Sequence, residues 1–407
     1  MHKRFPLFGR VLPALLIAIL LATLVVSAAV AGQAPPRIVA IADVHGAYAE
    51  LTALLQRTKI IDANLRWVGG PATLVQLGDV PDRGAQTRQC LDLLMALERQ
   101  APKQGGSVVA LIGNHEAMNL IGDVRYVTPE IYRSFASAEA EKKREQAYSD
   151  YLKFLDHHKD HAHAVMAPRD AAAKAAWMEA HPAGFVEYRE AFGPKGTYGK
   201  WIRGRHAVVT LGDGIFVHGG LNPALEFASV RELDERVMAE ITAFDALWKS
   251  LVDQKLVWRY MTFREAVEFV GEELAWMQGT GKPLKAEAVR PIVLLADYRN
   301  WLLASPDGPL WFRGLAQGDE AALQAGVTAM LDRLQARFIA VGHTVQSKTD
   351  ITPRFENRVF LLDTGMLASE YKGRPSALEI QDGRFTAHYA DGDPVALPAP
   401  PGGSKIP

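Results

Sequence analysis

The fold of this 407-residue chain is decided by one stretch, Gly78-Asp79-Val80-Pro81-Asp82-Arg83-Gly84. An apolar run over 73–77 leads directly into it, and such a run before a glycine-bounded polar turn predicts a strand and its end. Open α/β sheets build their sites at the carboxyl ends of strands. At such a place one carboxylate could bridge two metal ions, the other could orient a histidine, and Arg83 could grip a phosphate.

The flanking sequence predicts an α/β fold. Apolar strands are predicted over 37–42, 74–77 and 108–112, and helices with one apolar face over 48–58 and 86–99 lie between them. Alternation of strand and helix indicates crossover units in a sheet. Further strands are predicted at 207–211, 214–217, 337–341, 358–362, 377–380 and 384–389.

Five of the predicted strands end in polar clusters, which are Asp43/His45, Asp79/Asp82/Arg83, Asn114/His115, His218 and His343. Any one of these clusters is weak evidence, because ordinary loops contain similar residues. Five strand ends in one chain would bring the side chains together on one face. Carboxylate, imidazole and amide ligands suit borderline divalent ions such as Mn, Fe or Zn. Two such ions about 3.5–4 Å apart clamp both ends of an in-line displacement at phosphorus.

These motifs resemble, in order, those of the metallo-dependent phosphoprotein phosphatases, which are calcineurin-like metallophosphoesterases. The matching segments are Asp43-Val44-His45-Gly46, Gly78 to Gly84, Gly113-Asn114-His115-Glu116, His218-Gly219-Gly220 and Gly342-His343. The loop from Gly308 to Gly314 resembles the bacterial-like branch called Shewanella-like phosphatases. The similarity extends over residues 37–380 and implies a central β-sandwich flanked by helices.

The resemblance also implies roles for individual residues. The implied metal ligands are Asp43, His45, Asp79, Asn114, His218 and His343, with Asp79 bridging two ions. Manganese is the expected metal, with iron or zinc as alternatives. His115 is implied to be the general acid, with Asp82 as its carboxylate partner. The implied substrate-binding residues are Arg83, Arg313 and Asn114.

We therefore expect a dinuclear phosphatase that hydrolyses phosphomonoesters by attack of a metal-bridging hydroxide. The favoured substrate is a phosphoprotein, modified on serine/threonine or tyrosine. One alternative is a hydrolase of small phosphoesters or dinucleoside polyphosphates, which would use the same core. Another is an exported metal- or phosphate-binding protein that has lost its catalytic power.

Composition excludes other classes of partner and site. The formal net charge is -1, which gives no electrostatic reason to expect a nucleic-acid partner. Cys90 is the only cysteine, so the chain can form neither an internal disulfide nor a multi-thiolate metal site.

The chain ends predict separate segments. His2, Lys3 and Arg4 precede a mostly apolar run over 11–31, which ends in Ala29-Val30-Ala31, and we interpret 1–31 as a secretory signal peptide. An uncleaved membrane anchor is the alternative, since the run is about the roughly 20 residues that span a bilayer. Both interpretations export the body of the chain, to the periplasm or an equivalent compartment.

The body is expected to be one catalytic domain over 37–390. Helical insertions are expected over about 122–200 and 230–303, and the Pro/Gly-rich tail over 391–407 is expected to be disordered. The first insertion contains the histidine-rich stretch 157–163. That stretch could bind metal, but we favour a solvated helix or loop face, because no strand end fixes its geometry.

Overall fold

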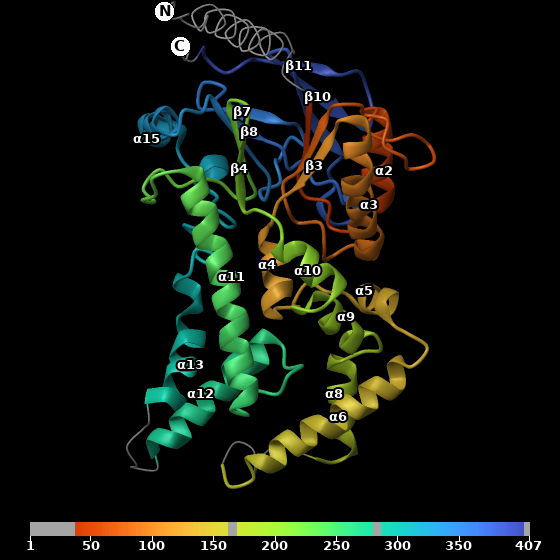
Figure 1. Ribbon diagram of the computed structural model, residues 1–407, viewed down its shortest axis with the longest axis vertical. Coiled ribbons are helices and arrows are strands. Elements are labelled where there is room, and N and C mark those ends of the chain that lie inside the picture. Colours follow the sequence, from red (N-terminus) through yellow and green to blue (C-terminus); the bar gives the residue numbers. More distant parts are fainter. Residues whose placement is uncertain (1–36, 162–168, 280–285, 403–407) are drawn as a thin grey trace, which may run out of the picture.

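Two packed β-sheets form the centre of the computed structural model, which describes residues 37–161, 169–279 and 286–402 (Figure 1). The six-stranded sheet has the order β11-β10-β9-β1-β2-β3. Its strands are β1 (Ile38–Ile41), β2 (Thr73–Gln76), β3 (Ser107–Ala110), β9 (Ser376–Gln381), β10 (Arg384–Tyr389) and β11 (Val395–Leu397). The five-stranded sheet has the order β4-β5-β6-β8-β7. Its strands are β4 (Val208–Leu211), β5 (Gly214–Val217), β6 (Phe338–Val341), β7 (Thr352–Arg354) and β8 (Val359–Leu361).

Successive side chains of a strand point to opposite faces of its sheet and contribute to a separate apolar core on each face. In β1, Ala40 belongs to the apolar cluster that also contains Phe385 of the same sheet and Phe216 and Phe338 of the facing sheet. Val39 and Ile41 point the other way and belong to the larger cluster shared with the helices. Residues buried on both faces explain why these strands are apolar throughout rather than alternating with polar residues. The predicted α/β fold with a central sandwich is confirmed.

Parallel pairing brings the important strand ends to one edge. In the first sheet β1 pairs with β2 and β2 with β3, each in parallel. In the second sheet β5 pairs with β6 and β6 with β8, also in parallel. Parallel strands end at the same edge of a sheet, so the loops that follow them are neighbours. An isolated parallel bridge joins Leu111, which directly follows β3, to His206, which lies shortly before β4. This bridge links the two sheets.

Helices cover the sandwich and extend away from it. The helices near the sheets include α2 (Tyr48–Arg57), α3 (Thr87–Gln100), α4 (Asn114–Ile121), α14 (Gly314–Gln317), α15 (Glu320–Arg333) and α16 (Ala368–Tyr371). Those of the first insertion are α5 (Pro129–Phe135), α6 (Ala140–His157), α8 (Ala171–Ala180), α9 (Phe185–Phe192) and α10 (Thr197–Arg203). Those of the second are α11 (Val230–Asp253), α12 (Phe263–Gly279) and α13 (Ala286–Ala296). Short 3-10 helices occur at Ala101–Gln104 and Asp297–Asn300.

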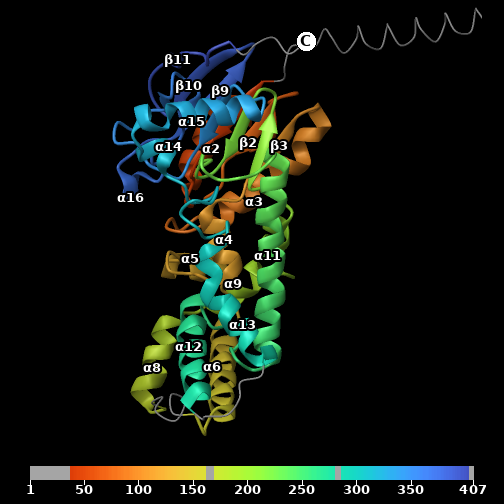
Figure 2. The ribbon, with the colours of Figure 1, turned by 90° about the vertical axis from the view of Figure 1, so that its left-hand side faces the viewer.

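The two insertions together form a helical arm. Figures 1 and 2 both show α6, α8 and α12 at the end of the molecule opposite the sheets, while α11 runs from the sheets toward that end. Apolar residues of α11 on one face, including Leu233, Val237 and Ile241, are buried. The arm is therefore packed along its length.

The C-terminal tail differs from the expected disorder. Val395–Leu397 forms β11, which pairs antiparallel with β10. The edge strand β10 offers unpaired backbone groups, and a short added strand satisfies them even when its own side chains are exposed. The proposed signal peptide or anchor at 1–31 lies outside the described residues. Within the described ranges, no helix is both long and apolar enough to cross a membrane.

Candidate active site

The predicted metal ligands, with Asp82, Arg83 and His115, lie in the loops that follow β1, β2, β5 and β6 and at the start of α4, which follows β3. Several of these loop residues adopt the left-handed backbone region with positive φ, which is rare for residues other than glycine. They are His45 (46°), Asp79 (58°), Asp82 (75°), Arg83 (65°) and His343 (67°). Strained backbone of this kind costs of order 1–3 kcal/mol per residue and clusters at functional sites.

One group of ligand-type atoms surrounds the ring of His218, which is fully buried. Its Nε2 atom lies 2.8 Å from Asn114 Oδ1, 3.2 Å from His343 Nδ1 and 3.3 Å from Asp79 Oδ2. Ligands about 2.0–2.1 Å from a tetrahedral ion are separated by roughly 3.3 Å. The spacing therefore fits one divalent ion among these four side chains.

A second group lies beside the first and shares Asp79. His45 Nε2 is 3.7 Å from Asp43 Oδ2 and 3.7 Å from Asp79 Oδ2. The other oxygen of each carboxylate accepts a backbone N–H: Asp43 Oδ1 from His343 and Asp79 Oδ1 from His115. Each carboxylate thus has one oxygen fixed by the fold and one facing the site. The structure brings all six predicted metal ligands together.

The rings of two histidines are oriented by backbone carbonyl groups. His45 Nδ1 lies 3.0 Å from the carbonyl oxygen of Pro81, and His218 Nδ1 lies 2.9 Å from that of Leu77. A proton on each Nδ1 would donate to the carbonyl and leave Nε2 as the lone pair that faces the site. Metal-binding histidines commonly have such a partner on the second nitrogen. The residues present therefore fit a pair of divalent cations.

The electrostatics also fit bound cations. Burial lowers the pKa of His45 to about 3 and that of His343 to about 2, so both rings are neutral, as metal ligands must be. Burial opposes protonation of His218, but Asp79 and then Asp43 raise its pKa to about 9. Although burial alone would raise it, His218 holds the pKa of Asp79 well below its usual range. These carboxylates therefore favour positive charge at this position.

His115 and Asp82 form a buried pair at the edge of the ligand groups. His115 Nδ1 lies 2.6 Å from Asp82 Oδ2, while His115 Nε2 lies 3.8 Å from Asp79 Oδ2. Burial acts to lower the pKa of His115, but Asp79 and Asp82 outweigh it and raise the pKa above its usual value. The pair thus favours the protonated form of the imidazole, whose Nε2 lies beside the carboxylate of Asp79.

The side chain of Asp82 is positioned by a further hydrogen bond. Asn119 Nδ2 donates to Asp82 Oδ1 at 2.9 Å, and also to the carbonyl oxygen of His115. The hydroxyl of Tyr188 in α9 donates to Asn119 Oδ1 at 2.6 Å. Sequence analysis did not select either residue. Asn119 lies one helical turn after His115 in α4, a spacing that could have drawn attention to it, whereas no local pattern indicates Tyr188.

Arg83 lies between two aromatic rings. Its guanidinium carbon is 4.6 Å from the centre of the Tyr126 ring and 5.3 Å from that of Tyr371. Arg83 Nη1 forms an ion pair with Glu370 at 3.1 Å, and the buried Nε atom has no hydrogen-bond partner among the described residues. Tyr126 packs near His115 and Tyr371 near His45. These aromatic residues and Glu370 were not anticipated from the sequence.

Arg313 and Asp363 also lie at or near the site. Arg313 Nη1 donates to the carbonyl oxygen of His343 at 2.9 Å, so this arginine lies beside the loop after β6. Asp363 is buried, and burial raises its pKa to about 6; its Oδ1 accepts from the backbone N–H of Gly365. Asp363 therefore shapes its own turn, in keeping with a supporting rather than a ligating position.

Glu116 joins the loops of β2 and β3. Its carboxylate accepts the backbone N–H groups of Asp79 (2.7 Å), Val80 (2.8 Å) and Gly113 (2.8 Å). The loops are so close that a Cβ atom at Gly113 would overlap Asp79 Oδ1. The Gly-Asn-His-Glu motif thus positions Asp79 as well as its own side chains.

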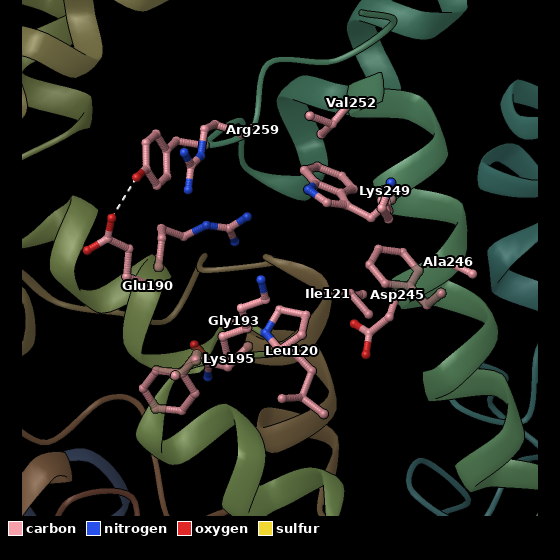
Figure 3. Close-up of a pocket in the computed structure, with 18 residues that line it drawn as sticks. Leu120, Ile121, Glu190, Gly193, Lys195, Asp245, Ala246, Lys249, Val252 and Arg259 are labelled. Atoms are coloured by element: carbon pink, nitrogen blue, oxygen red, sulfur yellow. Dashed lines mark hydrogen bonds between the residues drawn. The ribbon is translucent and has the colours of Figure 1, made fainter. Parts of the chain in front are cut away.

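A cavity of about 930 Å³ lies next to the site, between α4, α9 and α11. Figure 3 shows Asp245 and Lys249 of α11 on one wall, with Glu190 and Arg259 across from them. Leu120 and Ile121 of α4 line its base. Asn119 also lines it. The cavity therefore reaches the back of the Asp82 pair rather than the ligand groups.

Comparison with known proteins identifies relatives of this arrangement. A family model described as calcineurin-like phosphoesterase matches residues 36–347. A protein of Plasmodium berghei named Shewanella-like protein phosphatase 1 is 25% identical over 356 residues, which cover 86% of this chain and 73% of the relative. Shewanella-like protein phosphatase 2 of Arabidopsis thaliana is 30% identical over 224 residues, covering 52% of this chain and 53% of the relative.

Solved structures show the same fold. The crystal structure of a cold-active protein-tyrosine phosphatase from a psychrophilic Shewanella species superposes with a TM-score of 0.52. The match covers 89% of this chain and 81% of that one, at 22% sequence identity.

We expect Gly113→Ala to reduce bound metal and activity severely, because the added methyl group must displace the Asp79 carboxylate. Metal analysis of the purified chain measures the effect. Gly271→Ala is the matched control: Gly271 lies inside α12 with no heavy atom within 4 Å of an added Cβ. It should leave metal content unchanged and add about 0.5–1 kcal/mol of stability. Normal metal content in Gly113→Ala would contradict the close approach.

Proposed function

The chain belongs to the calcineurin-like phosphoesterase family, and from this premise we propose that it is a phosphoprotein phosphatase that uses two divalent metal ions. Family membership and the phosphatase relatives make it a phosphoric monoester hydrolase. The number of ions, the residue roles and the substrate class are our inferences. The observation that carries them is the buried His115–Asp82 pair directly beside a cluster of six ligand-type side chains.

The two ions would be held by the groups described above. Asp43, His45 and Asp79 would bind one, and the second would be bound by Asp79, Asn114, His218 and His343. When bound, two such ions lower the pKa of a water molecule and stabilise the developing charge on a phosphoryl group. Manganese, iron and zinc all accept these ligand types, and manganese is our choice for reconstitution.

The protein's own groups would supply the remaining chemistry. His115 would donate its proton from Nε2 to the oxygen of the departing alcohol, which otherwise leaves as a costly alkoxide. Asp82 would keep the ring oriented through Nδ1 and favour its protonated form. Arg83 would bind phosphate oxygens through its guanidinium, with Arg313 as a second positive charge near the His343 loop.

Two observations support a phosphoprotein substrate. The named relatives in Plasmodium and Arabidopsis are protein phosphatases, and their similarity extends over much of this chain. Tyr126 and Tyr371 flank Arg83, and aromatic side chains beside a phosphate-binding arginine would pack against the ring of a phosphotyrosine. We therefore propose phosphotyrosine as the favoured residue.

A substrate panel tests the function. Protein depleted of metal and then reconstituted with Mn²⁺ would be assayed on phosphotyrosine peptide, phosphoserine peptide and diadenosine tetraphosphate. We expect the highest kcat/KM on the phosphotyrosine peptide. Preference for diadenosine tetraphosphate would point to a hydrolase of small phosphoesters. No metal-dependent turnover at neutral pH would indicate a binding protein without activity.

We expect His115→Asn to lower kcat by roughly two to four orders of magnitude, the usual cost of losing a general acid. Bound metal should stay the same, because the proposed ligands are retained. The matched control is His206→Asn, since His206 is paired with Asp234 outside the site and its side chain is 59% exposed. Equal turnover in His115→Asn and the wild type would exclude the acid role.

We expect Asn119→Ala to lower kcat about 10- to 100-fold, the range found when an outer partner of a site is removed. KM and metal content should change little, because Asn119 acts through Asp82. Tyr188→Phe removes only the bond behind Asn119 and should cost less. A loss of metal in parallel with kcat would instead assign Asn119 a purely structural role.

We expect Glu370→Gln to lower KM for a phosphorylated substrate by about 1.4- to 5-fold, with kcat unchanged. Glu370 is half exposed, and exposed ion pairs contribute about 0.2–1 kcal/mol, which a phosphate must overcome to engage Arg83. Glu235→Gln breaks a surface pair with Arg231 on α11 and serves as the control. If both variants leave KM unchanged, Glu370 does not compete for Arg83.

A further inference from the structure

The histidine-rich stretch lies at the far end of the helical arm. His157 ends α6, His158 and His161 follow it, and α12 passes close by with Glu273. Figures 1 and 2 show the ends of α6 and α12 on the side of the molecule opposite the sheets. The stretch was expected to be a solvated face, yet His158 is only 3% exposed. A solvated face therefore does not explain the burial of His158.

Three side chains of this region converge. His158, His161 and Glu273 each direct a ligand-type atom to a place where all three atoms lie within 4.8 Å of one another. His161 Nδ1 and Glu273 Oε2 are 2.7 Å apart. The side chain of Glu273 is 2% exposed, and a buried carboxylate is commonly hydrogen-bonded, paired with a positive charge or bound to a metal ion.

The orientation of His158 suits a ligand. Its Nδ1 lies 3.0 Å from the carbonyl oxygen of Phe154, so a proton on Nδ1 would donate there and leave the Nε2 lone pair for an ion. Burial lowers the pKa of this ring, which favours the neutral form that binds metal. Phe154 and Phe269 pack against it with ring centres 4.7 and 5.1 Å away. The ring is therefore fixed rather than mobile.

The second histidine is fixed in a similar way. The ring of His161 stacks on Trp276 of α12, with ring centres 3.5 Å apart. Two imidazoles and one carboxylate, oriented by backbone and aromatic contacts, form a donor set that zinc accepts. An ion pair between His161 and Glu273 is the competing explanation. It accounts for two of the three residues and gives His158 no part.

We propose that His158, His161 and Glu273 bind a zinc ion that joins α6 to α12. The site is separate from the proposed catalytic ions and lies in the helical arm. Its positive charge would compensate the buried carboxylate of Glu273. By linking the two insertions, the ion would hold the end of the arm together.

Counting bound zinc tests the proposal. Full-length Asp79→Asn protein, in which the shared catalytic ligand is altered, would be equilibrated with Zn²⁺, freed of excess metal and analysed for zinc per chain. Adding His158→Ala should lower the count by one. His157→Ala is the matched control, because His157 ends the same helix and is exposed. It should leave the count unchanged. Equal counts with and without His158→Ala would overturn the proposal.

A second variant covers the possibility that His158→Ala impairs folding. Glu273→Gln keeps the size and hydrogen-bonding capacity of the side chain but removes its charge. We expect it to raise the dissociation constant for zinc at this site at least tenfold in a direct titration. Circular dichroism would establish that the variant is folded. Unchanged zinc affinity in the folded variant would assign the cluster to an ion pair alone. Neither result depends on phosphatase activity.

Discussion

The carboxylate of Glu116 is the interaction on which the site most depends. It accepts three backbone N–H groups from two different loops, at Asp79, Val80 and Gly113. Burial and the nearby charge of Asp79 raise the pKa of Glu116 to about 7, and the three N–H bonds oppose this rise because they stabilise the ionised form through charge-assisted hydrogen bonds. The loops after β2 and β3 are thereby fixed relative to each other, and with them Asp79, the ligand that we propose both ions share.

Further backbone N–H groups extend this arrangement around the site. The carbonyl oxygen of Asp79 accepts N–H groups from Val44 and His45, and Asp43 Oδ1 accepts that of His343. The backbone carbonyl of Asp79 therefore joins the loops after β1 and β2, and the carboxylate of Asp43, a proposed metal ligand, joins loops of the two sheets. The strained positive-φ residues at these loops persist because the surrounding bonds over-determine their backbone. Asp43 and Asp79 both hold the loops together and face the proposed metal site. A substitution at either residue is therefore expected to affect both the loop structure and metal binding.

The sequence predicted what local patterns encode and missed what long-range packing decides. Strand-end motifs such as Gly-Asp-x-x-Asp-Arg-Gly located the predicted ligands, because apolar runs reveal strands and strands determine where their loops meet. Tyr371 and Tyr188 were missed, since only tertiary packing brings them to Arg83 and Asn119. The strand β11 was missed because its pairing depends on an exposed edge rather than on its own composition.

The helical insertions begin close to the proposed catalytic residues and can therefore influence which substrate binds. The first begins after α4, which carries His115 and Asn119, and the second begins beyond the loop of β5, which carries His218. Both thus leave the sandwich at the edge where the ligands meet. Tyr188 in α9 bonds to Asn119, so the first insertion is coupled to the Asp82–His115 pair. The hydrolysis proposed above uses residues that cluster at the strand ends and at the start of α4, whereas we expect the choice among phosphoesters to depend on surfaces near them. Because those surfaces include segments such as the Tyr126 loop, which carry no motif, substrate preference must be read from the folded chain.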